Sequence, residues 1–321
     1  MSGALSENRG AIDWLRALFA TDAPGGPILV RLLIGLVVFF PEGIQKLVFP
    51  DILGAGRFAN IGIPIRVKQD ERVQFHILNG SAGEIRSLAL PGHVFRVVAL
   101  DGNPAPTQTD VPVLWLGTAE RISAIVHMNH PGVWIMGDLA DDDRKHGMGT
   151  VVEYAGQKGK PQWIKPKPYQ WDYTHFGKLG PPPTAPDETI EMTIVKHNAA
   201  LNGFNQWTLN GDAFSMETMK PAYTVHQGRR YRLKFRNASD DIHPLHLHRH
   251  SFELVRVGDK PTAGIVKDVV MLGGFQEIEF DFIADNPGPT LFHCHQQLHL
   301  DFGFMALFRY AFTREHVLRD S

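Results

Sequence analysis

The sequence of 321 residues contains a single cysteine, Cys294, so a disulfide framework is excluded. Basic residues number 32 and acidic residues 34, and this balance gives no indication of nucleic acid as a partner. The apolar run at 27–40 has 14 residues and one charge, Arg31, whereas a membrane-spanning helix needs about 20. The run also begins too late for a signal peptide and lacks a small-residue cleavage site.

Glycine and proline are abundant, with 31 and 22 copies spread among short apolar segments. Short apolar runs between turn residues are typical of β-strands. The chain is long enough for two domains of ordinary size. The sequence therefore predicts an all-β protein with many turns.

The second half of the chain repeats the first with a period near 157 residues. Three pairs of segments align, namely 67–81 with 225–239, 93–98 with 250–255, and 131–154 with 287–310. This period is too long for a solenoid and fits two similar domains. We therefore expect Greek-key β-sandwiches at 64–157 and 189–321, joined by a linker rich in Pro and Lys at 158–188.

Histidine, with 16 copies, is concentrated near the cysteine in the second repeat. Two segments hold seven residues that can bind a metal: His243, His246, His248, His293, Cys294, His295 and His299. The first repeat has none of them, since it carries Arg86, Ala89 and Pro91 and, aligned to within one residue, Met136, Gly137 and Asp138. These side chains therefore indicate a chemical function of the second repeat that the shared fold does not require. His250, by contrast, matches His93, and we expect both to be packed histidines that hydrogen-bond a loop.

Strand geometry divides the seven residues into two groups. Because alternate residues share a face, Cys294 should face His243 and His299. One thiolate with two imidazoles is typical of blue copper sites. The opposite face would carry a second group of four imidazoles: His246, His248, His293 and His295. A structural zinc site is a weaker alternative, because such sites usually contain more than one cysteine.

The segments HPLHLHRHSF and HCHQQLHLDFGF resemble the copper-binding signature of the last cupredoxin domain of multicopper oxidases of the laccase type. The similarity extends over about residues 65–312, and LPGHVFRVVALDGNPAP resembles the metal-free middle domain of that family. The resemblance implies two tandem cupredoxin-like domains, with His243, Cys294 and His299 as type 1 copper ligands. It also implies that the four further imidazoles form half of a type 2/type 3 trinuclear copper centre.

The resemblance further implies a laccase-like copper oxidoreductase. Such an enzyme takes single electrons from a small reducing substrate, such as a phenol or a metal ion, at the type 1 copper. It passes them to the trinuclear centre, which reduces O₂ to water. The family uses eight histidines there, and this chain has no HxH motif outside the two segments. We expect a partner chain or an oligomer to supply the rest. The alternative is a type 1 electron-transfer or copper-binding protein that lacks a working trinuclear centre.

The family's axial position, ten residues after the cysteine, is occupied by Phe304. Its ring cannot coordinate a metal, and Met305 beside it should face the other way. We therefore expect a three-coordinate copper with a raised reduction potential. The acidic run at 138–143 is expected to be a solvated turn, and Glu253 and Asp301 are candidates for orienting imidazoles.

Residues 1–63 are expected to form a separate N-terminal segment with a short hydrophobic helix. The run at 27–40 and the loop after it resemble the first membrane helix of DoxX-type membrane proteins. This segment could associate with a membrane or pack against the rest of the protein. We expect a periplasmic or other extracytoplasmic location.

Overall fold

The computed structural model describes residues 64–180, 182 and 184–311 of the chain. The expected N-terminal helix, including residues 27–40, lies outside these residues. Among the described residues, none of the helices has the length and apolar character needed to cross a membrane. Ile65 begins one compact unit that contains both repeats.

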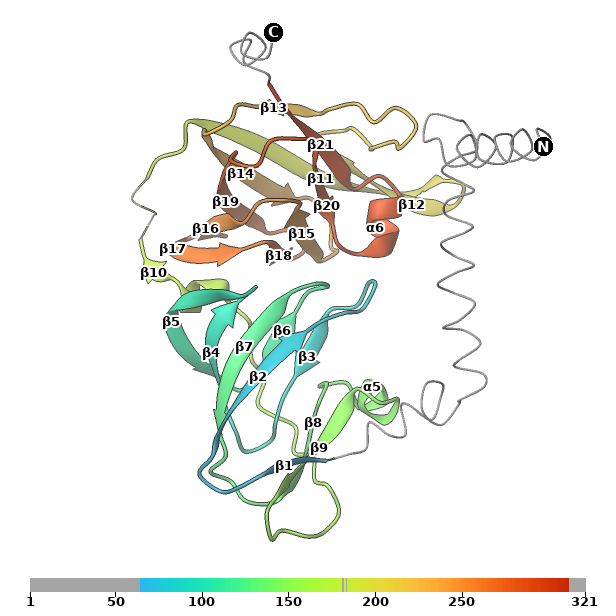
Figure 1. The fold of residues 1–321 in the computed structure, drawn as a ribbon. Coiled ribbons are helices and arrows are strands. Elements are labelled where there is room, and N and C mark those ends of the chain that lie inside the picture. Colours follow the sequence, from blue (N-terminus) through green and yellow to red (C-terminus); the bar gives the residue numbers. More distant parts are fainter. Residues whose placement is uncertain (1–63, 181, 183, 312–321) are drawn as a thin grey trace, which may run out of the picture. The chain divides into compact units, whose positions relative to one another are not determined.

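The first repeat folds as a β-sandwich of nine strands (Figure 1). They are β1 (Ile65–Val67), β2 (Arg72–Leu78), β3 (Arg86–Leu88), β4 (Phe95–Leu100), β5 (Asn103–Val111), β6 (Leu114–Leu116), β7 (Arg121–His127), β8 (Val133–Gly137) and β9 (Gly149–Tyr154). One sheet has the order β2-β7-β4-β5, and the facing strands pair as β1-β9-β8 and β3-β6. A bridge between Ala89 and Gly137 connects these two smaller sheets. A short helix, α5 (Asp141–Lys145), follows β8.

The second repeat has the same strands in the same order. They are β13 (Tyr223–Val225), β14 (Arg230–Asn237), β15 (His243–Leu247), β16 (Phe252–Val257), β17 (Lys260–Lys267), β18 (Val269–Leu272), β19 (Glu277–Ile283), β20 (Thr290–Cys294) and β21 (Met305–Tyr310). The order β14-β19-β16-β17 repeats β2-β7-β4-β5, and β13-β21-β20-β15-β18 repeats the opposite layer. A short helix, α6 (Gln297–Asp301), follows β20 as α5 follows β8.

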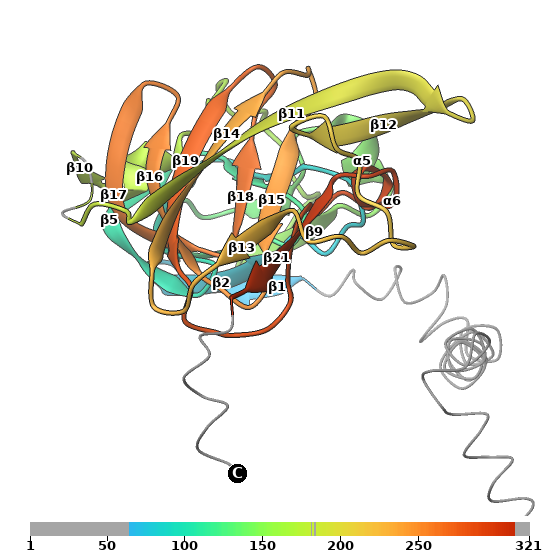
Figure 2. The ribbon, with the colours of Figure 1, turned by 90° about the horizontal axis from the view of Figure 1, so that it is seen from above.

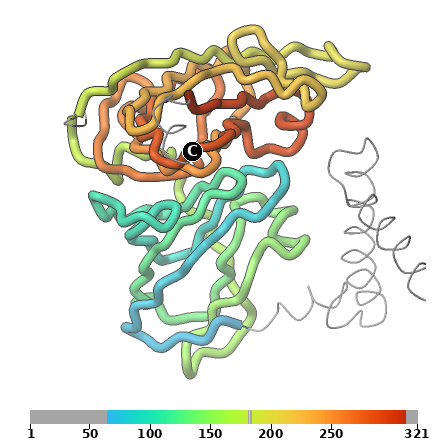
Figure 3. The backbone as a smooth tube through the Cα atoms, turned by 45° about the horizontal axis from the view of Figure 1, so that its top comes forward, coloured from blue at the N-terminus to red at the C-terminus, as the bar shows by residue number. Residues whose placement is uncertain are grey.

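The linker and two additional strands extend the β14-β19-β16-β17 sheet of the second domain. The chain passes from the first domain through the linker to the second domain, as the tube in Figure 3 shows. The linker forms a 3₁₀ turn (Tyr173–Phe176) and β10 (Lys178–Leu179), which pairs with β17. Strands β11 (Glu188–Leu201) and β12 (Phe204–Leu209) then form a long ribbon at the other edge of the sheet (Figure 2).

The core follows from alternation along the strands. In β14, Tyr231, Leu233 and Phe235 are buried, while the residues between them are more exposed. Phe235 packs against Phe292 of the opposite sheet with ring centroids 4.8 Å apart. Burial of such a side chain stabilises the fold by about 1.5–3 kcal/mol. These inward side chains join the two layers, and the prediction of tandem cupredoxin-like sandwiches is confirmed.

The paired histidines of the two repeats have the same structural role. In the second domain, His250 Nδ1 donates to the His248 carbonyl oxygen (3.0 Å), and the Tyr310 hydroxyl lies 2.7 Å from His250 Nε2. In the first, His93 is held in the same way by Pro91 and Tyr154. Both histidines are therefore packed residues that hydrogen-bond a loop, as expected.

Candidate metal centre

Three buried side chains of the second domain meet where β15, β20 and α6 come together. The two Nδ1 atoms of His243 and His299 lie 3.0 Å apart. The Cys294 sulfur lies 3.6 Å from His243 Nδ1 and 3.4 Å from His299 Nδ1. Sequence reasoning placed these three residues in one group, and the structure brings them together.

These spacings fit a transition-metal ion. Nitrogen and sulfur ligands lie about 2.0–2.3 Å from ions of this size. Three such atoms around one ion are therefore about 3.3–3.9 Å from one another, close to the separations among His243, Cys294 and His299. One sulfur and two imidazole nitrogens also form the donor set of blue copper.

Burial keeps the two imidazoles neutral. It lowers the pKa of His243 to about 3, helped by the neighbouring His299, and it lowers the pKa of His299 to about 4. Burial also raises the pKa of the Cys294 thiol. Nδ1 of each ring can therefore hold a lone pair for a metal at neutral pH, while metal binding must displace the thiol proton.

Neighbouring side chains orient both rings. The Ser239 hydroxyl lies 3.3 Å from His243 Nε2 and donates to Asn237 Oδ1, so Nε2 carries the ring proton and Nδ1 is free. Trp207 of β12 stacks on His299 with ring centroids 4.0 Å apart, and its indole N–H donates to Asp241. Asn237 and Ser239 align with Asn79 and Ser81 of the first repeat, whereas the sequence carried no signal for Trp207.

Phe304, the residue expected at the axial position, lies beside the group. It is fully buried, and its ring centroid is 4.8 Å from that of His243. Its backbone N–H donates to the His299 carbonyl oxygen. Met305 is paired with His293 in the neighbouring strand, and it lines a cavity that contains none of His243, Cys294 and His299.

A second group of histidines lies on the other side of Cys294. Ring nitrogens of His246, His248 and His293 lie within 4.8 Å of one another, and the Nε2 atoms of His248 and His293 are 2.9 Å apart. The ring of His295 is 5.4 Å from that of His293. The four imidazoles thus gather on one face, as the strand alternation predicted.

Backbone carbonyls set the ring orientation in this group. Nδ1 of His246 donates to the Asp268 oxygen (2.7 Å), and Nδ1 of His293 donates to the Cys294 oxygen (2.8 Å). Both rings therefore present Nε2 to a metal. Burial lowers the pKa of His246 and His248, and lowers that of His293 to about 4.

Other side chains occupy the corresponding place in the first domain. Gly137 pairs with Gly149 in the first domain, and His293 pairs with Met305 at the equivalent place in the second. Gly137 is therefore the equivalent of His293, and Asp138 is the equivalent of Cys294, one residue away from the first alignment. The expected solvated turn is wrong for Asp138, which is buried and accepts from Ser87. Asp143, whose side chain is 42% exposed, forms an ion pair with Arg86 at 2.8 Å. These two acidic residues and Arg86 therefore occupy the positions of Cys294, His299 and His243.

The two acidic residues considered as orienting groups have other partners. Glu253 pairs with Arg230 (2.6 Å), and Asp301 accepts from Gln297. The imidazoles instead use the Asp268 and Cys294 carbonyl oxygens. Main-chain acceptors of this kind have no signature in a sequence.

The chain matches two sequence models of the multicopper oxidase family. One covers residues 52–155 and the other covers residues 183–312. The chain belongs to the multicopper oxidase family. Family membership implies copper as the metal, and the group of His243, Cys294 and His299 is typical of a type 1 copper site.

The multicopper oxidase MmcO of Mycobacterium tuberculosis is 29% identical over 255 residues, which cover 78% of this chain and 49% of that protein. Laccase-2 of Fomitopsis schrenkii is 22% identical, over 75% of this chain and 54% of its own length. The solved structure of Fet3p, a multicopper oxidase that functions in iron import, superposes with a TM-score of 0.64 at 16% identity, covering 80% of this chain and 61% of that one. The chain thus spans about half of these curated relatives.

Proposed function

We propose that this chain is the electron-accepting part of a laccase-like copper oxidoreductase and carries half of its oxygen-reducing centre. His243, Cys294 and His299 are the type 1 ligands in this proposal, with Phe304 at the axial position. The second group, His246, His248, His293 and His295, supplies four of the eight type 2/type 3 ligands. Family membership and the separation of the two groups by Cys294 support this assignment.

The position of Cys294 between the groups is the observation that carries the proposal. Its sulfur belongs to the first group, and its carbonyl oxygen accepts a hydrogen bond from His293 of the second. Copper bound at the first group would supply one-electron chemistry. A single residue therefore connects the two groups, through its own bonds to His293 and through this hydrogen bond.

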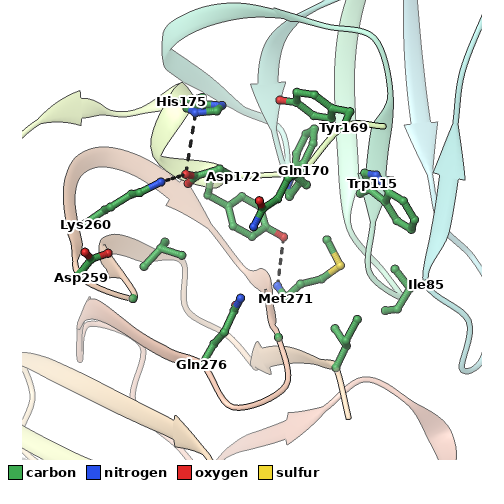
Figure 4. A pocket seen from close by; sticks show the side chains of 16 residues that line it. Ile85, Trp115, Tyr169, Gln170, Asp172, His175, Asp259, Lys260, Met271 and Gln276 are labelled. Carbon is green, nitrogen blue, oxygen red and sulfur yellow. Dashed lines mark hydrogen bonds and ion pairs between the residues drawn. The ribbon is translucent and has the colours of Figure 1, made fainter. Parts of the chain in front are cut away.

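A pocket of ≈ 670 Å³ offers a place for a reducing substrate (Figure 4). Trp115 and Tyr169 line it, and so does Ile242, the residue before His243. Its polar end holds the ion pair between Asp172 and Lys260 (2.7 Å). A small aromatic reductant suits the rings of this pocket, and O₂ is the second substrate.

The second group requires imidazoles from elsewhere to act on oxygen. His248 is exposed, and His246 and His295 are half-buried, so this face remains partly open. We propose that a partner chain or a further subunit of an oligomer contributes the remaining histidines. An extracytoplasmic location, with membrane association through residues 27–40, is also part of the proposal, and cell fractionation tests it.

Copper stoichiometry with optical and paramagnetic resonance spectra tests the function. We expect a blue type 1 signal, additional copper, and O₂ consumption when the chain is purified with its partner. Cys294→Ser should abolish the blue signal, and His248→Ala with His293→Ala should remove only the additional copper. His93→Gln, at a packed histidine, is the control. One copper without O₂ consumption would indicate the electron-transfer alternative, and a colourless protein would refute both.

A further inference from the structure

Buried charges connect the two domains beside the second histidine group. The ammonium of Lys267, at the end of β17, lies 3.0 Å from Asp101 Oδ2 and 3.1 Å from Glu120 Oε1. The exposed fractions of the three side chains are 0%, 0% and 1%, in that order. Lys267 belongs to the second domain and both carboxylates belong to the first. This contact is therefore a charge cluster sealed between the domains.

The first domain also holds the residue that follows Lys267. The Arg121 guanidinium donates to both carboxylate oxygens of Asp268, at 2.6 and 2.7 Å. Asp101 Oδ2 accepts from the backbone N–H groups of Asp268 (3.3 Å) and Val269 (3.1 Å). Paired hydrogen bonds between Arg and a carboxylate restrict geometry strongly. Both the side chain and the backbone of Asp268 are thus held by the first domain.

The carbonyl oxygen of this same residue orients a histidine. Asp268 O accepts from His246 Nδ1 at 2.7 Å, which leaves His246 Nε2 to face His248 and His293. Hydrogen bonds of this kind determine which ring nitrogen carries the proton and how the ring lies. The position of one backbone oxygen therefore decides which nitrogen His246 presents.

We propose that Arg121 and Asp101 are positioning residues that act on His246 through Asp268. The domain without metal ligands then has a defined task, because it holds the acceptor that selects the His246 tautomer. This inference rests on the proposed function in one respect, that His246 binds metal. The tautomer itself is a property of the metal-free protein and can be measured separately.

The test compares Arg121→Gln with Arg96→Gln in the full chain. Arg96 forms a similar paired contact with Asp110, at 2.7 and 3.0 Å, within the first domain and on its surface. Nitrogen-15 spectra of the histidine rings in the metal-free protein report the tautomer, and His246→Gln identifies the signal. Copper titration then reports the affinity of the second group while the blue signal monitors the first.

We expect Arg121→Gln to shift His246 from the pure Nδ1–H tautomer to a mixture, and R96Q to leave it unchanged. Copper affinity at the second group should fall about 10-fold or more, with the blue signal intact. Asp268→Asn keeps the carbonyl and a side-chain acceptor, so it provides a milder variant with a smaller shift. An unchanged tautomer in a folded R121Q or D268N protein would overturn the inference. If the His246 tautomer shifts in R121Q but the wild type binds no copper at the second group, the inference stands and only the proposed function is refuted.

Discussion

Replacing Lys267 by Met removes a buried ammonium and leaves two buried carboxylates behind. The methionine side chain is unbranched like that of lysine and only one heavy atom shorter, so the main change is electrostatic. Asp101 retains N–H donors from Arg121, Asp268 and Val269. Glu120 retains the Gly117 N–H and the Tyr173 hydroxyl. Neither carboxylate loses all of its partners.

Loss of one partner from a buried ion pair typically costs 3–5 kcal/mol, because the remaining charge is uncompensated. Because the carboxylates retain these donors, the lower end of this range applies. We therefore expect the free energy of unfolding to fall by about 3 kcal/mol. Domains have a total stability of only about 5–15 kcal/mol. This single substitution should therefore be measurable in urea denaturation followed by tryptophan fluorescence.

Alkaline pH provides an independent test of the same cluster. Burial lowers the pKa of Lys267, but Asp101 and Glu120 outweigh it and raise the pKa above the ordinary 10.5. Its stabilising effect is therefore complete below the unfolded value and is lost as the pH rises through the folded one. The wild type should lose stability more steeply than K267M above pH 10.5.

Lys260→Met is the matched control, since Lys260 begins the strand that Lys267 ends and pairs with Asp172 in an exposed setting. We expect no change beyond measurement error, because exposed ion pairs are screened by water. The reasoning would be refuted if K267M lost less than about 1 kcal/mol, or if both lysine variants lost equal stability.

Three further changes probe the first group. Ser239→Ala removes the acceptor at His243 Nε2 and should cost about 1 kcal/mol in unfolding free energy; it should also alter the blue spectrum, which Ser81→Ala in the first domain should not do. Phe304→Met offers a thioether and should lower the reduction potential measured by redox titration, and an unchanged potential would argue against an axial position. Trp207→Leu uncovers His299 and should speed reduction by small reductants in stopped-flow measurements, whereas unchanged rates would show that the indole does not limit access.

The two candidate groups of metal-binding side chains could be predicted from the sequence, because the spacing within each segment is local. Alternation along β15 places His243 and His246 on opposite faces, and alternation along β20 does the same for His293 and Cys294. The internal repeat served as a control, because a histidine present in both halves, such as His93, had to serve the fold. Both signals depend only on residues a few positions apart or on matching positions of the duplication.

What only the tertiary structure decided involves residues far apart in the chain and main-chain atoms. Asp101 and Lys267 are brought together across the domain contact, and each would be an ordinary surface charge in its own segment. The Asp268 oxygen that orients His246 is a backbone atom, which every residue possesses. Packing and burial select such contacts, because only the folded chain removes these charges and carbonyl groups from water. The sequence by itself therefore determined which side chains can bind the metal, and the fold decided how their rings are held.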